Sequence, residues 1–180
     1  MHRILIFNLG GTSTKLAVFD EETLVVEGTI RHTDREIQGC TDNAEQIAFR
    51  RGAIEAWLLE NHISLDDLSA VVIRSSGAGL CKKGGTYLVT GKLRDGMYAA
   101  YRSSFPKAPH PSFIVLPLAD EILGSRPVPI YIVDPDGVDE FQDVAYITGH
   151  PDLPRSSGFH VLNHKAIARK ASRDLGKRYE

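Results

Sequence analysis

One short polar segment between two apolar runs holds the residue types that phosphoryl groups bind. It reads Asn8-Leu9-Gly10-Gly11-Thr12-Ser13-Thr14-Lys15. Its glycines allow a ligand to approach the backbone closely, its hydroxyls add hydrogen-bond donors, and Lys15 adds a positive charge. The GxxxxGKS/T spacing of a Walker loop is absent and no helix is predicted directly after it, so neither a Walker loop nor a Rossmann fingerprint is indicated. The alternative is a polar hairpin turn that uses its glycines for geometry.

Two further polar residues stand at the carboxyl ends of predicted strands. Asp134 follows the apolar run 130–133, and Arg74 follows the apolar run 70–73. In open α/β sheets this end of a strand faces the ligand crevice, and an arginine there can bind a carboxylate or a phosphate through two hydrogen bonds. The alternatives are a turn opener or helix cap for Asp134 and an ordinary surface position for Arg74.

The histidines and cysteines give weaker signals. His160 and His164 are four residues apart on a predicted helix, a spacing that can bind zinc, but no third ligand is evident, which favours a structural pair. Cys40 and Cys81 have no evident base partner and form neither a disulfide framework nor a metal-site pattern. Their number favours a reduced, cytoplasmic protein.

The hydrophobic pattern predicts an α/β fold around these residues. Three short apolar runs open the chain and predict an antiparallel meander, and two more predict buried strands; they are residues 4–7, 16–19, 24–30, 70–73 and 130–133. Helices are predicted over residues 43–62, 112–123, 138–148 and 159–177, with a kink or a late start at Pro117. The sheet is therefore expected to be mixed: a three-strand meander extended by parallel strands through helical crossovers.

Composition argues against several classes of partner. The 180 residues suit one domain, and the formal net charge of -2 gives no reason to expect a nucleic-acid or membrane partner. Basic residues recur every fourth position from Lys165 to Lys177 in the last predicted helix, so they share one face. That face is interpreted as solvated; the alternative is a surface for phosphate or nucleic acid.

In order and spacing, these segments resemble the butyrate kinases and, more distantly, the acetate kinases of the acetate and sugar kinase, Hsp70 and actin superfamily. The resemblance runs from Arg3 to about Arg169. Residues 8–15 resemble the family's Asn-Pro-Gly-Ser-Thr-Ser-Thr-Lys loop, with Leu9 in place of proline and Gly11 in place of serine. The other matching segments are Gly84-Gly85-Thr86-Tyr87, His110-Pro111-Ser112, Ile132-Val133-Asp134-Pro135 and the stretch 159–169.

The resemblance implies a ribonuclease H-like, actin-like ATPase domain and a reversible, Mg²⁺-dependent transfer of the γ-phosphoryl group of ATP to a butyrate-like carboxylate. Arg74 would then bind the carboxylate or the moving phosphoryl group, and His160 and His110 would stabilise its equatorial oxygens. Asp134 would orient the acceptor and, with Asn8, help to bind Mg²⁺ through water. The residues expected along the phosphates are Asn8, Gly10, Gly11, Thr12, Ser13 and Lys15.

The resemblance also implies a domain arrangement. Residues 1–180 would form the amino-terminal domain of a two-domain kinase that assembles as a homo-oligomer, and without the nucleotide-binding domain we expect no useful turnover. One alternative is a sugar kinase of the same superfamily, since Leu9-Gly10-Gly11-Thr12 resembles the Gly-Gly-Thr loop of hexose kinases, although those have aspartate where this chain has Asn8. The other is a binding or oligomerisation module that has lost catalysis.

Overall fold

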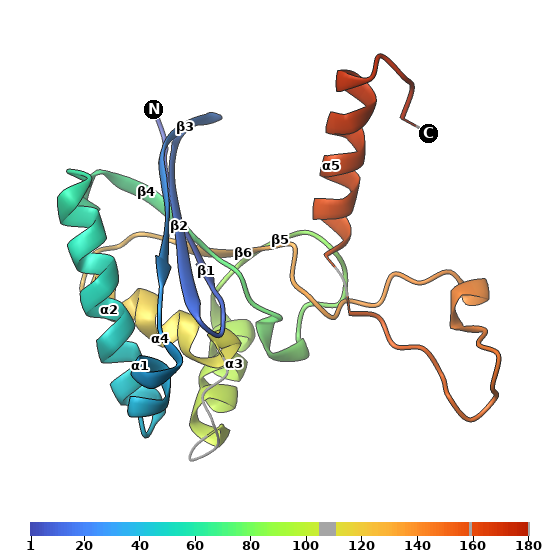
Figure 1. Cartoon of the computed structure of the whole chain (residues 1–180), viewed down its shortest axis with the longest axis horizontal. Coiled ribbons are helices and arrows are strands. Elements are labelled where there is room, and N and C mark those ends of the chain that lie inside the picture. Colours follow the sequence, from blue (N-terminus) through green and yellow to red (C-terminus); the bar gives the residue numbers. More distant parts are fainter. Residues whose placement is uncertain (105–110, 159, 180) are drawn as a thin grey trace.

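The computed structural model describes residues 1–104, 111–158 and 160–179. Its centre is a six-stranded sheet in the order β3-β2-β1-β4-β6-β5 (Figure 1). The strands are β1 (Arg3–Leu9), β2 (Ser13–Asp20), β3 (Thr23–Arg31), β4 (Leu68–Ile73), β5 (Thr86–Leu88) and β6 (Ile130–Val133). Strands β1 to β3 form the predicted antiparallel meander, while β4 lies parallel to β1, and β6 lies parallel to β4. The predicted mixed α/β sheet is confirmed.

The helices are α1 (Asp34–Gly39), α2 (Asn43–Glu60), α3 (Gly91–Ser103), α4 (Pro111–Leu123) and α5 (Val161–Asp174). Helix α2 begins as predicted: the side chain of Asp42 accepts the backbone N–H of Glu45 at 2.8 Å. Helix α4 begins at Pro111 and includes Pro117, so of the two expectations, a kink or a late start at Pro117, the late start is wrong. Packing against α2, α3, β1 and β4 buries most of α4, and this outweighs the hydrogen bond lost at Pro117.

The structure contradicts one predicted helix and adds elements that the pattern did not indicate. Residues 138–148 contain only a short 3-10 turn, η3 (Asp143–Tyr146), because most of their side chains are exposed and no apolar face is buried to stabilise a helix. Strand β5 pairs antiparallel with β6 at the sheet edge and is only three residues long, which is too short for a clear alternating pattern. Helix α3 begins at Gly91 and contains Gly96, two residues that weaken a helix signal.

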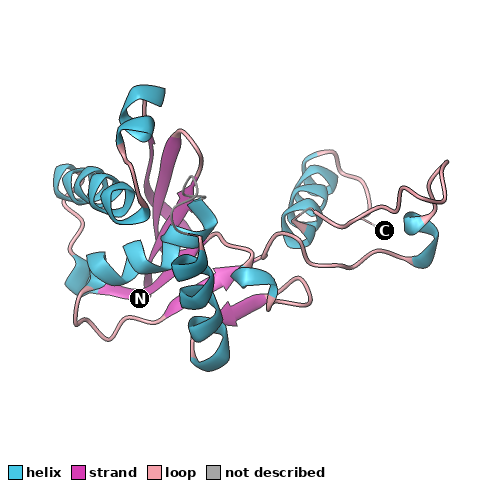
Figure 2. Ribbon diagram, turned by 90° about the horizontal axis from the view of Figure 1, so that it is seen from below, coloured by secondary structure: helices cyan, strands magenta, loops and turns pink. Residues whose placement is uncertain are grey.

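The helices cover the two faces of the sheet unequally. Helix α4 packs on β1 and β4 and contacts α2 and α3, which buries the side chains of Leu5, Phe7, Val71 and Ile73. The side chains between them along the strands point to the other face, where they are only partly buried. Figures 1 and 2 show that α5 and the loop before it extend away from the other helices. None of the described helices is long and apolar enough to span a bilayer.

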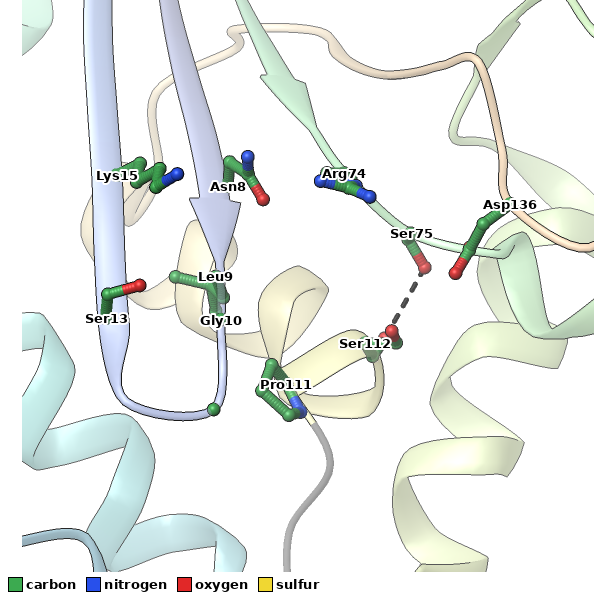
Figure 3. A pocket seen from close by; sticks show the side chains of 11 residues that line it. Asn8, Leu9, Gly10, Ser13, Lys15, Arg74, Ser75, Pro111, Ser112 and Asp136 are labelled. Atoms are coloured by element: carbon green, nitrogen blue, oxygen red, sulfur yellow. Dashed lines mark hydrogen bonds between the residues drawn. The ribbon is translucent and has the colours of Figure 1, made fainter. Parts of the chain in front are cut away.

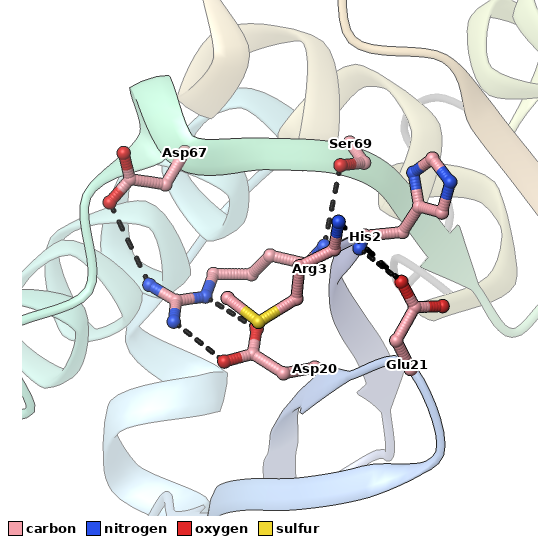
Figure 4. A network of polar contacts seen from close by, with 7 residues as sticks. His2, Arg3, Asp20, Glu21, Asp67 and Ser69 are labelled. Atoms are coloured by element: carbon pink, nitrogen blue, oxygen red, sulfur yellow. Dashed lines mark hydrogen bonds and ion pairs between the residues drawn. The ribbon is translucent and has the colours of Figure 1, made fainter.

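A network around Arg3 holds the amino-terminal end of β1 (Figure 4). The Arg3 guanidinium donates two hydrogen bonds of 2.8 Å to Asp20 on β2, and it lies 3.7 Å from Asp67, just before β4. The pairing with Asp20 lowers the pKa of that carboxyl group. Since β1 runs from Arg3 to Leu9, this charged clamp and the Gly-rich loop stand at opposite ends of the strand.

Candidate active site

The predicted phosphate-binding residues line a polar pocket of about 390 Å³ at the end of β1 (Figure 3). The hairpin between β1 and β2 forms one side of this pocket, and the chain after β4 forms the other. Residues predicted from the sequence that line it are Asn8, Gly10, Gly11, Ser13, Lys15 and Arg74. Thr12 is exposed at the tip of the hairpin and is not among the lining residues.

A second, more apolar pocket of about 580 Å³ adjoins the polar one, and Asn8 and Arg74 line both. Its floor is the less covered face of the sheet, with Ile6 and Val72 among its residues, and α5 forms a further wall. Asp134 and His160 also line this pocket. Four residues singled out from the sequence thus meet where the ends of β1, β4 and β6 face the start of α5.

Three of these residues form a chain of hydrogen bonds. Nδ1 of His160 lies 2.7 Å from the backbone oxygen of Asp134, an acceptor only, so this nitrogen carries the proton. Nε2 is then an acceptor, and the Arg74 guanidinium donates a hydrogen bond to it. The backbone of Asp134 therefore fixes the tautomer and the direction of the imidazole, which in turn contacts the arginine.

The side chain of Asp134 also caps a helix, the alternative role that its place in the sequence allows. Its two carboxylate oxygens accept the backbone N–H groups of Leu162 and Asn163 at 2.8 and 2.9 Å, at the start of α5. A carboxylate there satisfies N–H groups that the helix itself leaves free and interacts favourably with the helix dipole. Asp134 has a φ of 55°, a left-handed conformation that aspartate tolerates better than most residues. The capping role is present within the site.

The structure also settles where other candidates lie. His110 lies outside the described residues. Among the residues described, no group of three or more histidine, cysteine or acidic side chains is placed to hold a metal ion, so His160 and His164 gain no third zinc ligand there. Cys40 and Cys81 are free thiols, and burial raises the pKa of each.

Sequence reasoning missed two residues of this region. Asp136 lines the polar pocket, and one of its carboxylate oxygens is buried without a hydrogen-bond partner among the described residues. Arg50 lies behind the Gly-rich hairpin and is fully buried. The position of Asp136 after Asp134-Pro135 was a usable signal, because it stands in the same loop at the strand end. Arg50 gave no signal, since an arginine in an amphipathic helix is normally exposed.

A buried histidine, His32, contacts the hairpin through Thr14. Nε2 of His32 lies 2.9 Å from Oγ1 of Thr14, and its ring packs edge-on against Phe49. Burial, and then the positive charge of Arg50, lower the pKa of His32, while Glu36 opposes this shift. The neutral ring is therefore the form that the fold accepts.

We expect the stability of the fold to fall as pH drops below about 6.5, the pKa of histidine in an unfolded chain. Below that pH the unfolded chain takes up a proton that folded His32 resists, which costs about 1 kcal/mol per pH unit until the folded-state pKa is reached. Thermal melts at pH 7.5 and 5.5 should show a larger loss for the wild type than for His32→Gln. Equal losses in both proteins would contradict this assignment.

Comparison with known structures places the fold in one class. The structure is similar to an acetate kinase from Porphyromonas gingivalis, with a TM-score of 0.58 and 14% sequence identity, covering 99% of this chain and 50% of that one. It is also similar to the acetate kinase of Entamoeba histolytica, with a TM-score of 0.57 and 17% identity, over 96% of this chain and 46% of that one. The fold is therefore one that acetate kinases contain.

Comparison of the sequence with curated proteins identifies a narrower group of relatives. No protein-family profile matches it. It is 40% identical to butyrate kinase 1 of Clostridium acetobutylicum over 100% of its length, and 38% identical to a probable butyrate kinase of Clostridium botulinum over 99%. The chain is therefore a homologue of the butyrate kinases. It spans about half the length of these curated relatives, 49% of each.

Proposed function

We propose that this chain supplies the carboxylate-binding and phosphoryl-binding side of a kinase that reversibly phosphorylates a short-chain, butyrate-like carboxylate with ATP to give an acyl phosphate. The observation that carries the proposal is the place of Arg74. It lines both the polar pocket beside the Gly-rich hairpin and the apolar pocket beside α5. A butyryl phosphate ligand needs an apolar pocket for its alkyl chain, an arginine for its carboxyl group and a polar pocket for its phosphoryl group. Arg74 lies between the two pockets and so provides this order.

Positioning and charge neutralisation perform most of the work in this proposal. A carboxylate acceptor is already ionised at neutral pH, so no strong general base is required. Arg74 can hold its oxygens through two donors, while the alkyl chain contacts apolar side chains such as Ile6 and Val72. Lys15 adds a donor to the phosphoryl group, whose negative charge spreads over its oxygens during transfer. His160 acts beside it by accepting a hydrogen bond from Arg74, which holds the guanidinium in place.

Magnesium and ATP complete the proposed reaction. Mg²⁺ keeps several waters and uses one or two carboxylates together with substrate phosphates. Asp134 fits a contact through water, because its oxygens each accept one N–H and retain a further lone pair. Asn8 would be the second water-bridged ligand. The ion would supply charge neutralisation on the phosphates.

We assign the adenosine site to a second domain, so that residues 1–180 form the amino-terminal domain of a two-domain cytoplasmic kinase. This part of the proposal is supported by the length of the relatives, of which the chain covers about half. If the adenosine site lies in a second domain, the 180-residue chain should bind the acyl ligand but should not catalyse phosphoryl transfer at an ordinary enzyme rate.

Calorimetry and a turnover assay test the proposal together. The purified chain should bind butyrate and, more tightly, butyryl phosphate, and it should not bind glucose, the ligand expected of a sugar kinase. Trapping acyl phosphate with hydroxylamine in the presence of ATP, Mg²⁺ and butyrate should give no product at a useful rate. Absence of binding by both acyl ligands would refute the proposed function, whereas rapid turnover would refute only the assignment of adenosine to a second domain.

A further inference from the structure

A fully buried arginine supports the Gly-rich hairpin from behind. Arg50 projects from α2, and none of its surface is exposed to solvent. One terminal nitrogen donates to the backbone oxygen of Ser13 at 3.0 Å and to Oγ1 of Thr14 at 2.9 Å. The other donates to the backbone oxygens of Gly10 and Gly11 at 2.8 and 3.0 Å. A single guanidinium therefore holds the whole turn.

The charge of Arg50 is not balanced by a neighbouring carboxylate. In residues 1–104, 111–158 and 160–179 no acidic side chain forms an ion pair with it, and its four acceptors are neutral. Its Nε atom is also buried without a hydrogen-bond partner in this part of the chain. Burial of an unbalanced charge destabilises a fold, and an apolar side chain would avoid that cost. The four hydrogen bonds stabilise the turn but leave this charge unbalanced, and an anion in front of the hairpin would balance it.

The contacts of Arg50 also fix the direction of the hairpin's amide groups. In a trans peptide the C=O and the following N–H point in opposite directions. Since the carbonyl oxygens of Gly10 and Gly11 point to Arg50, the N–H groups of Gly11 and Thr12 point away from it. Neither N–H group donates to another of the described residues. Successive free N–H groups of this kind form an anion-binding concavity.

We propose that Arg50 is a positioning residue for the phosphoryl group, acting through the hairpin rather than by contact. It turns the carbonyls of Gly10 and Gly11 inward and presents outward the N–H group of Gly11, which lines the polar pocket, and that of Thr12 beside it. Its charge adds to that of Lys15 and Arg74, which line the pocket. The inference rests on the proposed function, because it assigns the phosphoryl end of the same acyl phosphate to this hairpin. It adds a residue that is buried and that the ligand does not touch.

The test compares two ligands that differ only in the phosphoryl group. Calorimetry would measure butyrate and butyryl phosphate binding to the wild type and to Arg50→Lys and Arg50→Met. We expect both variants to bind butyryl phosphate at least tenfold more weakly, with butyrate affinity within twofold of the wild type. A general structural defect would weaken the binding of both ligands. Arg51→Met is the matched control, since Arg51 is the next residue of α2 and pairs with Glu55 on the surface.

Amide chemical shifts keep the test decisive if Arg50→Met fails to fold. In the wild type, butyryl phosphate should shift the amide signals of Gly11 and Thr12, and Arg50→Lys should lose that response. Arg50 variants that bind butyryl phosphate as tightly as the wild type would overturn the role of Arg50 and leave the proposed function standing. A wild-type chain that binds neither ligand would overturn the proposed function, and this inference with it.

Discussion

Replacing Arg74 by alanine is expected to weaken binding of both butyrate and butyryl phosphate at least 100-fold, which corresponds to about 2.7 kcal/mol. The reason is that Arg74 lies where the two pockets meet and is the group proposed to hold the carboxylate. Charge-assisted hydrogen bonds from a guanidinium fork are about twice as strong as neutral ones. Arg74→Lys should recover only part of the affinity, because a lysine offers a point charge without the planar fork. Calorimetry with both ligands measures the effect.

The loss should not come from unfolding. Arg74 is exposed, and its side-chain hydrogen bond is to His160. Arg126→Ala is a suitable control, since Arg126 forms a surface ion pair with Asp66 and does not line either pocket of the site. We expect the melting temperature of Arg74→Ala to stay within a few degrees of the wild type. If Arg74→Ala binds both ligands normally, the carboxylate site lies elsewhere in the chain.

The parts of the site that were predictable from the sequence are those that follow strands. Asn8, Arg74 and Asp134 each stand at the end of an apolar run, and the ends of β1, β4 and β6 meet because these strands are parallel neighbours. The hairpin was also predictable from local sequence, because glycines and hydroxyl residues interrupt two neighbouring β-strand patterns. Local sequence therefore carried both the residue types and their approximate place.

What could not be predicted depends on contacts between distant segments. Arg50 is thirty-nine and forty residues from Gly11 and Gly10, and only the packing of α2 on the meander brings it to their carbonyl oxygens. The apolar pocket likewise requires α5 to stand beside β1 and β4. The missed strand β5 and the wrong helix at residues 138–148 have a related cause. Three residues are too few to show a period, and a weak helical pattern is not stable without a face to pack against.

Two roles are open to Asp134: capping α5, and binding the ligand or Mg²⁺. An experiment can separate them. The carboxylate of Asp134 caps α5, and its backbone oxygen orients His160. Helix α5 has one buried residue, Val161, so most of its side chains contribute little packing. The cap should therefore account for much of the helix's local stability, which we put at about 2 kcal/mol for the pair of charge-assisted hydrogen bonds.

Asp134→Ala is accordingly expected to unfold α5 locally while the sheet and α4 remain intact. Hydrogen exchange followed by mass spectrometry should show faster exchange in peptides from residues 161–174 and no change in peptides from β1 or α4. Asp134→Asn should fall in between, because its amide oxygen can still accept one N–H while its NH₂ group cannot. Binding of butyryl phosphate should decline in the same order, since His160 is the first residue before the helix. A variant that loses binding while α5 keeps wild-type protection would instead assign Asp134 to the ligand or to Mg²⁺, and its capping contacts would then be incidental to function.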